Sequence, residues 1–288
     1  MDTFIEFLKV IFIGIIEGIT EWLPVSSTGH MILAEELFPL KTMSEPFYNM
    51  FLYVIQLGAI LSVLVLFFHR LNPFSRKKSV DERRATVRMW KMVIIGVLPA
   101  AVIGIALDDL LEAHVFVEGV RAYVVAAALI LYGVLYVLIE RLRHKEPTVT
   151  DISHITPRIA LLIGAFQVLS IIPGTSRSGS TVLGALLLGV SRPVAAEFSF
   201  FMAIPIMVGV SLLKVGKFAL GSLDGLPGYA VGGTQIWLLI VGFVVAFLVS
   251  LVVIRFLMDF VRRHSFEAFG WYRILLGAAV LTYFLIAA

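Results

Sequence analysis

Long continuous runs of apolar residues constrain this chain more than any other feature of its sequence. Six of them are long enough to cross a bilayer as a helix, which takes about 20 residues; they lie at about 47–69, 90–110, 119–141, 194–215, 235–258 and 269–287. Only 15% of the 288 residues are charged, whereas soluble domains average about 25%. The sequence therefore predicts an all-α integral membrane protein with six transmembrane helices.

Two further apolar regions, 3–40 and 156–190, are interrupted near the middle by proline, glycine and hydroxyl residues. Each half has about 20 residues or fewer, so the interruption would lie at membrane depth. Irregular backbone is tolerated there only where it is buried in protein or lines a polar cavity. We therefore expect two re-entrant helix–loop–helix hairpins. The alternative is that each half spans fully and places its polar run at a membrane interface.

The two halves of the chain are similar to each other. A shift of 150 residues aligns five identical residues in the broken regions and places Glu17 opposite Gln167. Each half, about 1–145 and about 150–288, would contain one hairpin followed by three spanning helices. Because three is odd, the second half would be inverted, and the two hairpin tips would meet near the midplane. We expect a single membrane domain built as an inverted-topology repeat.

Basic residues indicate how the chain sits in the membrane. They gather after the first, third and fifth predicted spans: Arg70, Arg76, Lys77, Lys78, Arg83, Arg84, Arg88 and Lys91; Arg141, Arg143, Lys145 and Arg158; and Arg255, Arg262 and Arg263. Positive loops are cytoplasmic, so both termini are expected to face outward. The net charge of +3 is small and scattered, which excludes a nucleic-acid partner.

A pair of carboxylates precedes the break in the first hairpin. Glu17 and Glu21 are four residues apart and share one helix face. A charged side chain at membrane depth costs about 3 kcal/mol or more, so such residues indicate function. Two carboxylates this close require that one is protonated or that a cation lies between them. The alternative is a polar stripe or an acidic turn at the interface.

The break itself has the composition of an anion-binding site. Pro24 ends the first helix, and Ser26, Ser27 and Thr28 can cap the helix that follows. The free N–H groups of a helix start bind anions. Helix capping needs one hydroxyl, so three hydroxyls followed by Gly29 and His30 indicate a site that does more than cap.

The second break carries the complementary charge. Arg177 lies in the run Gly174, Thr175, Ser176, Arg177, Ser178 and Gly179. A guanidinium can hold two phosphate oxygens with parallel hydrogen bonds; the alternative is an arginine that extends to the interface. Two helix starts and one arginine are thus expected to bind a multiply charged anion. The acidic pair beside it requires a bridging Mg²⁺ or Ca²⁺, or an acid–base role.

At these residues the chain resembles the undecaprenyl-diphosphate phosphatase family, also called the bacitracin-resistance family, over essentially its whole length. The family's acidic motif corresponds to residues 17–21, followed by the run 24–30, and its second motif corresponds to residues 173–181. The resemblance implies a bacterial plasma-membrane enzyme that hydrolyses a C55 isoprenyl diphosphate to the monophosphate carrier used for peptidoglycan. It also implies divalent-cation dependence, bacitracin resistance on overproduction and an active site on the outward face.

We expect in-line attack on the terminal phosphorus, with Ser27 as nucleophile and His30 taking its proton. Arg177, Ser176, Ser178 and the backbone N–H groups would neutralise the phosphoryl charge. In a variant that the sequence leaves open, His30 attacks or activates water. The competing interpretation is a transporter that flips the monophosphate lipid, because inverted repeats with broken helices are common in transporters. A homo-oligomer is compatible with either function.

Overall fold

The structure, a computed structural model, describes residues 2–114, 120–142, 146–223, 226, 229 and 231–287, with the side chains of 2, 108–114, 223 and 287 left out. Most of this part of the chain is helical, and it contains no β-strand. The α-helices are α1 (Asp2–Thr20), α2 (Ser27–Leu37), α3 (Glu45–Leu66), α4 (Phe68–Leu71), α5 (Val80–His114), α6 (Arg121–Leu142), α7 (Pro157–Val168), α8 (Arg177–Leu187), α9 (Arg192–Leu223), α10 (Gly233–Arg263) and α11 (Glu267–Ala287). Short 3₁₀ turns occur at Ile152–His154 and Leu169–Ile171. The predicted all-α class is confirmed.

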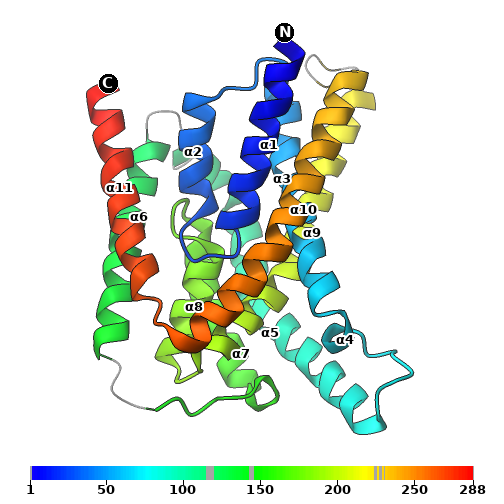
Figure 1. Cartoon of the computed structure of the whole chain (residues 1–288), viewed down its shortest axis with the longest axis vertical. Coiled ribbons are helices and arrows are strands. Elements are labelled where there is room, and N and C mark those ends of the chain that lie inside the picture. Colours follow the sequence, from blue (N-terminus) through cyan, green and yellow to red (C-terminus); the bar gives the residue numbers. More distant parts are fainter. Residues whose placement is uncertain are drawn as a thin grey trace.

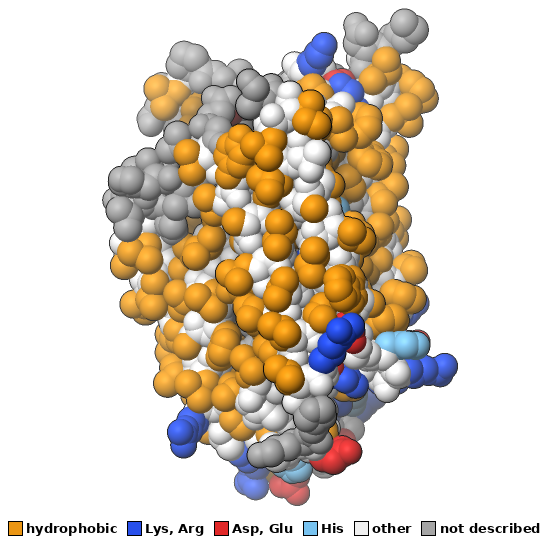
Figure 2. Space-filling view, turned by 90° about the vertical axis from the view of Figure 1, so that its left-hand side faces the viewer, with side chains coloured by type: hydrophobic (Ala, Val, Ile, Leu, Met, Phe, Trp, Pro, Cys, Tyr) orange, Lys and Arg blue, Asp and Glu red, His pale blue; other side chains and the backbone are white. Residues whose placement is uncertain are grey.

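The six predicted spans correspond to α3, α5, α6, α9, α10 and α11, each of which is long and apolar enough to cross a membrane. On the face shown in Figure 2, apolar side chains cover the middle of the molecule and charged side chains gather toward its ends. Helices α5, α9 and α10 are longer than predicted. Helix α5 starts about ten residues early because its first turns form a polar, amphipathic extension of the apolar run. Two basic residues used for orientation, Arg143 and Lys145, lie outside the described residues.

Each broken region forms two short helices joined by a turn. Helices α1 and α2 contact each other, as do α7 and α8, and α2 ends near the end of the molecule where α1 begins (Figure 1). The turn at residues 21–25 contains Pro24, whose ring cannot continue a helix. Helices α2 and α8 begin after capping serines, Ser26 and Ser176.

Each broken region packs against a spanning helix of the other half. Helix α1 lies on α10, and α7 lies on α5. Glycines allow both close approaches: a β-carbon on Gly14 would be 3.0 Å from the carbonyl oxygen of Gly242, and one on Gly164 would overlap the carbonyl of Gly96. The two halves of the chain are therefore held together by close backbone contact, which brings the two turns into the same interior.

Candidate active site

The two turns meet through one carboxylate, one hydroxyl and one guanidinium. Arg177, the first residue of α8, donates from Nη2 to Oε1 of Glu21 at 3.1 Å, although the two residues are 156 positions apart. The hydroxyl of Ser27 donates to the other oxygen of Glu21, Oε2, at 3.1 Å. Nη1 of Arg177 donates to the carbonyl of Ser199 at 2.8 Å. Glu21 thus aligns a hydroxyl and a cation from opposite halves of the chain.

The two helix starts have the same local geometry. The side chain of Ser26 accepts from the N–H of Gly29 at 3.3 Å, and that of Ser176 accepts from the N–H of Gly179 at 3.1 Å. Both serines have a positive φ, 73° and 72°, in a region that residues other than glycine rarely adopt. At each helix start, the constrained backbone and the capping hydrogen bond fix the orientation of the first turn.

Burial separates the residues that can meet a ligand from those that support them. Ser27, Thr28, His30, Ser176 and Arg177 are half-buried. Among the other predicted site residues, Glu17, Glu21, Ser26, Gly29, Gly174, Thr175, Ser178 and Gly179 are buried. The half-buried set contains the Ser27 hydroxyl, the His30 imidazole and the Arg177 guanidinium, together with hydroxyls at both helix starts. This face offers donors suited to an anion with several oxygens.

Glu17 lies one helical turn before Glu21 and is buried, with Oε1 lacking any hydrogen-bond partner. Carboxylate oxygens are the ligands that Mg²⁺ and Ca²⁺ prefer, and an unpartnered buried oxygen leaves coordination capacity free. Within the described residues, no cluster of three acidic or histidine side chains could enclose a metal. A cation held by this pair would have to take its remaining ligands from elsewhere, for example from a phosphate group.

His30 is not hydrogen-bonded to Ser27. Its Nδ1 lies 2.8 Å from the carbonyl oxygen of Ser26, and its Nε2 lies 2.7 Å from the hydroxyl of Tyr272. Because a carbonyl only accepts, Nδ1 carries a proton, and Nε2 of the neutral ring accepts from Tyr272. The Ser27 proton is instead directed at Glu21, so the expected Ser27–His30 contact is replaced by a Ser27–Glu21 contact.

Several predicted phosphate-binding residues hold the turns together. Ser178 donates to the carbonyl oxygens of Glu21 and Leu23, at 3.3 and 3.2 Å, and its hydroxyl lies 3.1 Å from that of Ser176. Gly174 has a φ of 89°, and a β-carbon there would lie 2.7 Å from the backbone of Val125 in α6. These contacts are structural, and a direct contact of these residues with phosphate stays a prediction.

Arg273 of α11 is a buried residue of the site that the sequence motifs do not contain. Its guanidinium donates to the carbonyls of Pro24 at 3.2 Å, Gly174 at 2.9 Å and Thr175 at 3.0 Å. It also lies over the ring of Tyr132, with 5.5 Å between Cζ and the ring centroid. One side chain thus joins both turns. An arginine within an apolar helix is a signal that could have identified this residue. Arg273 follows Trp271 and Tyr272, however, so its sequence context resembles that of an anchor at the membrane interface.

Comparisons with known proteins identify the family of the chain. The sequence model of the family described as "Bacitracin resistance protein BacA" matches residues 10–279. The chain is 51% identical to "Undecaprenyl-diphosphatase 1" of Clostridioides difficile over 286 residues, 99% of each chain. It is 52% identical to "Undecaprenyl-diphosphatase" of Streptococcus mutans over 282 residues, 97% of this chain and 96% of the relative. It is 48% identical to the Enterococcus faecalis protein of that name over 283 residues, 98% and 99% of the two chains. The chain belongs to the bacitracin resistance protein family.

Proposed function

We propose that this protein is an undecaprenyl-diphosphatase of the bacterial plasma membrane. It hydrolyses undecaprenyl diphosphate to undecaprenyl phosphate and inorganic phosphate, which returns the lipid carrier to cell-wall synthesis. The observation that carries the proposal is the contact of Ser27 and Arg177 with the two oxygens of Glu21. This contact places the proposed nucleophile, the hydroxyl of Ser27, and the guanidinium of Arg177, proposed to bind phosphate, beside the same carboxylate. The relatives' names supply the substrate class.

The contacts support a two-step displacement. Ser27 Oγ attacks the terminal phosphorus as Glu21 accepts its proton, and the bond from that phosphorus to the bridging oxygen breaks to release undecaprenyl phosphate. Water then cleaves the phosphoserine, returning Ser27 and releasing phosphate. Arg177 retains donors beyond the two that hold it, and these stabilise the phosphoryl oxygens with the N–H groups at the starts of α2 and α8. His30, held by Tyr272, lines the same half-buried face.

A divalent cation, Mg²⁺ or Ca²⁺, is part of the proposal. Glu17 and Glu21 would hold it, and the unpartnered Oε1 of Glu17 supports that assignment. When bound, the cation would offset the negative charge that a diphosphate adds to two buried carboxylates. Glu17 thereby supplies charge and position rather than a nucleophile.

Hydrolysis is favoured over lipid flipping by the Ser27–Glu21 hydrogen bond, because moving an anion across a bilayer requires Arg177 but no activated hydroxyl.

We further propose that the chain is an inverted repeat of about 1–145 and about 150–288, with both broken regions re-entrant. The crosswise packing of α1 on α10 and of α7 on α5 supports this repeat. The termini and the active site would face outward, and the basic end would face the cytoplasm.

Phosphate release from undecaprenyl diphosphate in detergent micelles tests the proposal, because micelles have no second compartment. We expect Ser27→Ala to abolish release and Arg177→Lys to lower it about a hundredfold, the usual loss on removing a fixed transition-state donor. Ser222→Ala, exposed near the end of α9, is the matched control and should behave as wild type. Chelation should stop release, and Glu17→Gln should need more Mg²⁺ for recovery.

Two outcomes would contradict this account. Near-normal turnover by Ser27→Ala would remove Ser27 as nucleophile and leave His30 or a water to attack. No phosphate release by the wild-type protein in micelles would reject hydrolysis in favour of transport.

A further inference from the structure

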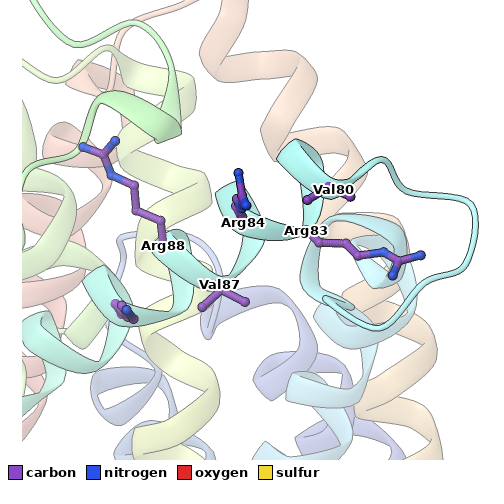
Figure 3. Close-up of a pocket in the computed structure, with 6 residues that line it drawn as sticks. Val80, Arg83, Arg84, Val87 and Arg88 are labelled. Atoms are coloured by element: carbon purple, nitrogen blue, oxygen red, sulfur yellow. The ribbon is translucent and has the colours of Figure 1, made fainter.

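The first turns of α5 lie at the end of the molecule opposite the start of α1 (Figure 1). They form a basic hollow, whose lining side chains are drawn in Figure 3. The hollow has a volume of about 480 Å³ and is lined by Val80, Arg83, Arg84, Val87, Arg88 and Lys91. Their spacing of three, four, seven, eight and eleven residues places all six on one helix face. All six side chains are exposed.

The opposite face of this segment is firmly anchored. Nζ of Lys78 donates to the carbonyl of Arg70 at 3.1 Å and to the hydroxyl of Thr86 at 2.7 Å. The indole of Trp90 donates to the carbonyl of Leu71 at 2.8 Å. A reciprocal cap between Ser79 and Glu82, at 2.7 and 3.2 Å, fixes the helix start. The basic face therefore has a fixed position and cannot turn inward.

The hollow carries a surplus of positive charge. Four of the seven lysines and arginines of residues 76–91 line the hollow, and the segment contains only two acids, Asp81 and Glu82. Arg84 lies 3.7 Å from Asp81, but both side chains are largely exposed, so that pair is weak. Arg83, Arg88 and Lys91 have no acidic partner among the described residues. Basic clusters beside a membrane span attract anionic lipid surfaces by about 1 kcal/mol per Lys or Arg.

The same helix face continues as an apolar stripe. Val80 and Val87 lie within the hollow, and Ile94 and Leu98 follow on the same side of α5, 48% and 51% exposed in a segment apolar enough to span a membrane. A soluble anion would contact only the basic side chains. An acidic protein segment would not contact an apolar stripe that enters the hydrocarbon region of the membrane. A ligand with an anionic head and an apolar tail matches both parts.

We propose that this hollow binds an anionic glycerophospholipid, with the headgroup phosphate on Arg84, Arg88 and Lys91 and an acyl chain along Val87, Ile94 and Leu98. The site is distinct from the turns that carry Glu21, Ser27 and Arg177, and the proposal stands whether or not the protein is a phosphatase. A lipid held here would fix the depth of α5 in the membrane. It would thereby also fix the position of α7, which packs on α5.

Native mass spectrometry of the purified protein in detergent tests the proposal. Phosphatidylglycerol and phosphatidylcholine with identical acyl chains are added separately to wild type, to Arg84→Gln/Arg88→Gln/Lys91→Gln and to a matched control, Arg158→Gln/Arg262→Gln/Arg263→Gln. The control also removes three exposed cations. We expect wild type and control to prefer phosphatidylglycerol, and the hollow variant to bind it about tenfold or more weakly. Melting temperature and phosphate release report whether each variant is folded.

Three results would overturn the proposal. Equal losses in the hollow variant and the control would mean that total charge decides binding. Equal binding of the two lipids by wild type would remove the role of the anionic head. Displacement of phosphatidylglycerol by glycerol 3-phosphate at matched concentration would show a site for soluble phosphate rather than lipid.

Discussion

At the residue scale, two serines fix the starts of the helices that present the site residues. Ser26 and Ser176 each combine a positive φ with a side-chain cap on the glycine three residues later. Glycine would relieve the backbone strain, which costs about 1–3 kcal/mol, but it would lose the cap, worth about 0.5–2 kcal/mol. Serine is retained because its oxygen fixes the first turn of the helix that presents Ser27 or Arg177.

This balance predicts an order of stability at position 176. Ser176→Ala keeps the strained φ and loses the cap, so we expect it to lower stability by about 1–2 kcal/mol. Ser176→Gly loses the cap but removes the strain, and it should be the more stable of the two variants. Thermal unfolding in one detergent measures both. A glycine variant less stable than the alanine variant would show that the φ of Ser176 is not strained.

At the element scale, close helix contacts decide where the broken regions lie. Helix α7 approaches α5 so closely that a β-carbon on Gly164 would overlap the carbonyl of Gly96, whereas one on Gly216 of α9 would meet no atom within 4 Å. Both glycines lie within a helix, but their surroundings differ: Gly164 faces the backbone of another helix at contact distance, and Gly216 faces open space. Comparing alanine substitutions at the two positions therefore separates the effect of packing from that of helix propensity.

Alanine at these positions should therefore act in opposite directions. Gly164→Ala should separate α7 from α5, lower the melting temperature and reduce phosphate release by moving Arg177. Gly216→Ala should leave the protein unchanged or stabilise it by up to about 1 kcal/mol, because alanine favours the helix. Melting temperature and phosphate release of both variants, measured side by side, check this. Equal effects would show that α7 does not depend on the contact with α5.

For the whole molecule, the ends of the helices define two faces. The start of α1 lies at one end, and the basic loop before α5 lies at the other (Figure 1). The chain has no cysteine, so single cysteines can be placed at the exposed positions Thr3 and Ser79. On intact cells, an impermeant thiol reagent should label Thr3→Cys and leave Ser79→Cys unlabelled if the basic face is cytoplasmic, as we propose from the distribution of lysines and arginines. The reverse pattern would invert the topology.

The sequence is informative wherever a side-chain pattern is local. Apolar runs predict the six spans, and the polar breaks predict which residues gather around Glu21. The position of Arg273 could not be predicted, because its partners are backbone carbonyls 98, 99 and 249 residues away and no side-chain pattern encodes them. The partner of His30 was missed for a related reason: Tyr272 is 242 residues away, whereas Ser27 is nearby in sequence.

The crosswise packing has a consequence for how the protein is made. Gly14 packs on Gly242, so the first helix to leave the ribosome meets its partner only after more than 200 further residues are translated, which takes about 10 to 45 s at common synthesis rates. Glu21 has no Arg177 beside it until 156 further residues are translated, and α10 follows later still. Arg273, whose hydrogen bonds join the two turns, is added later still, with the last helix of the chain.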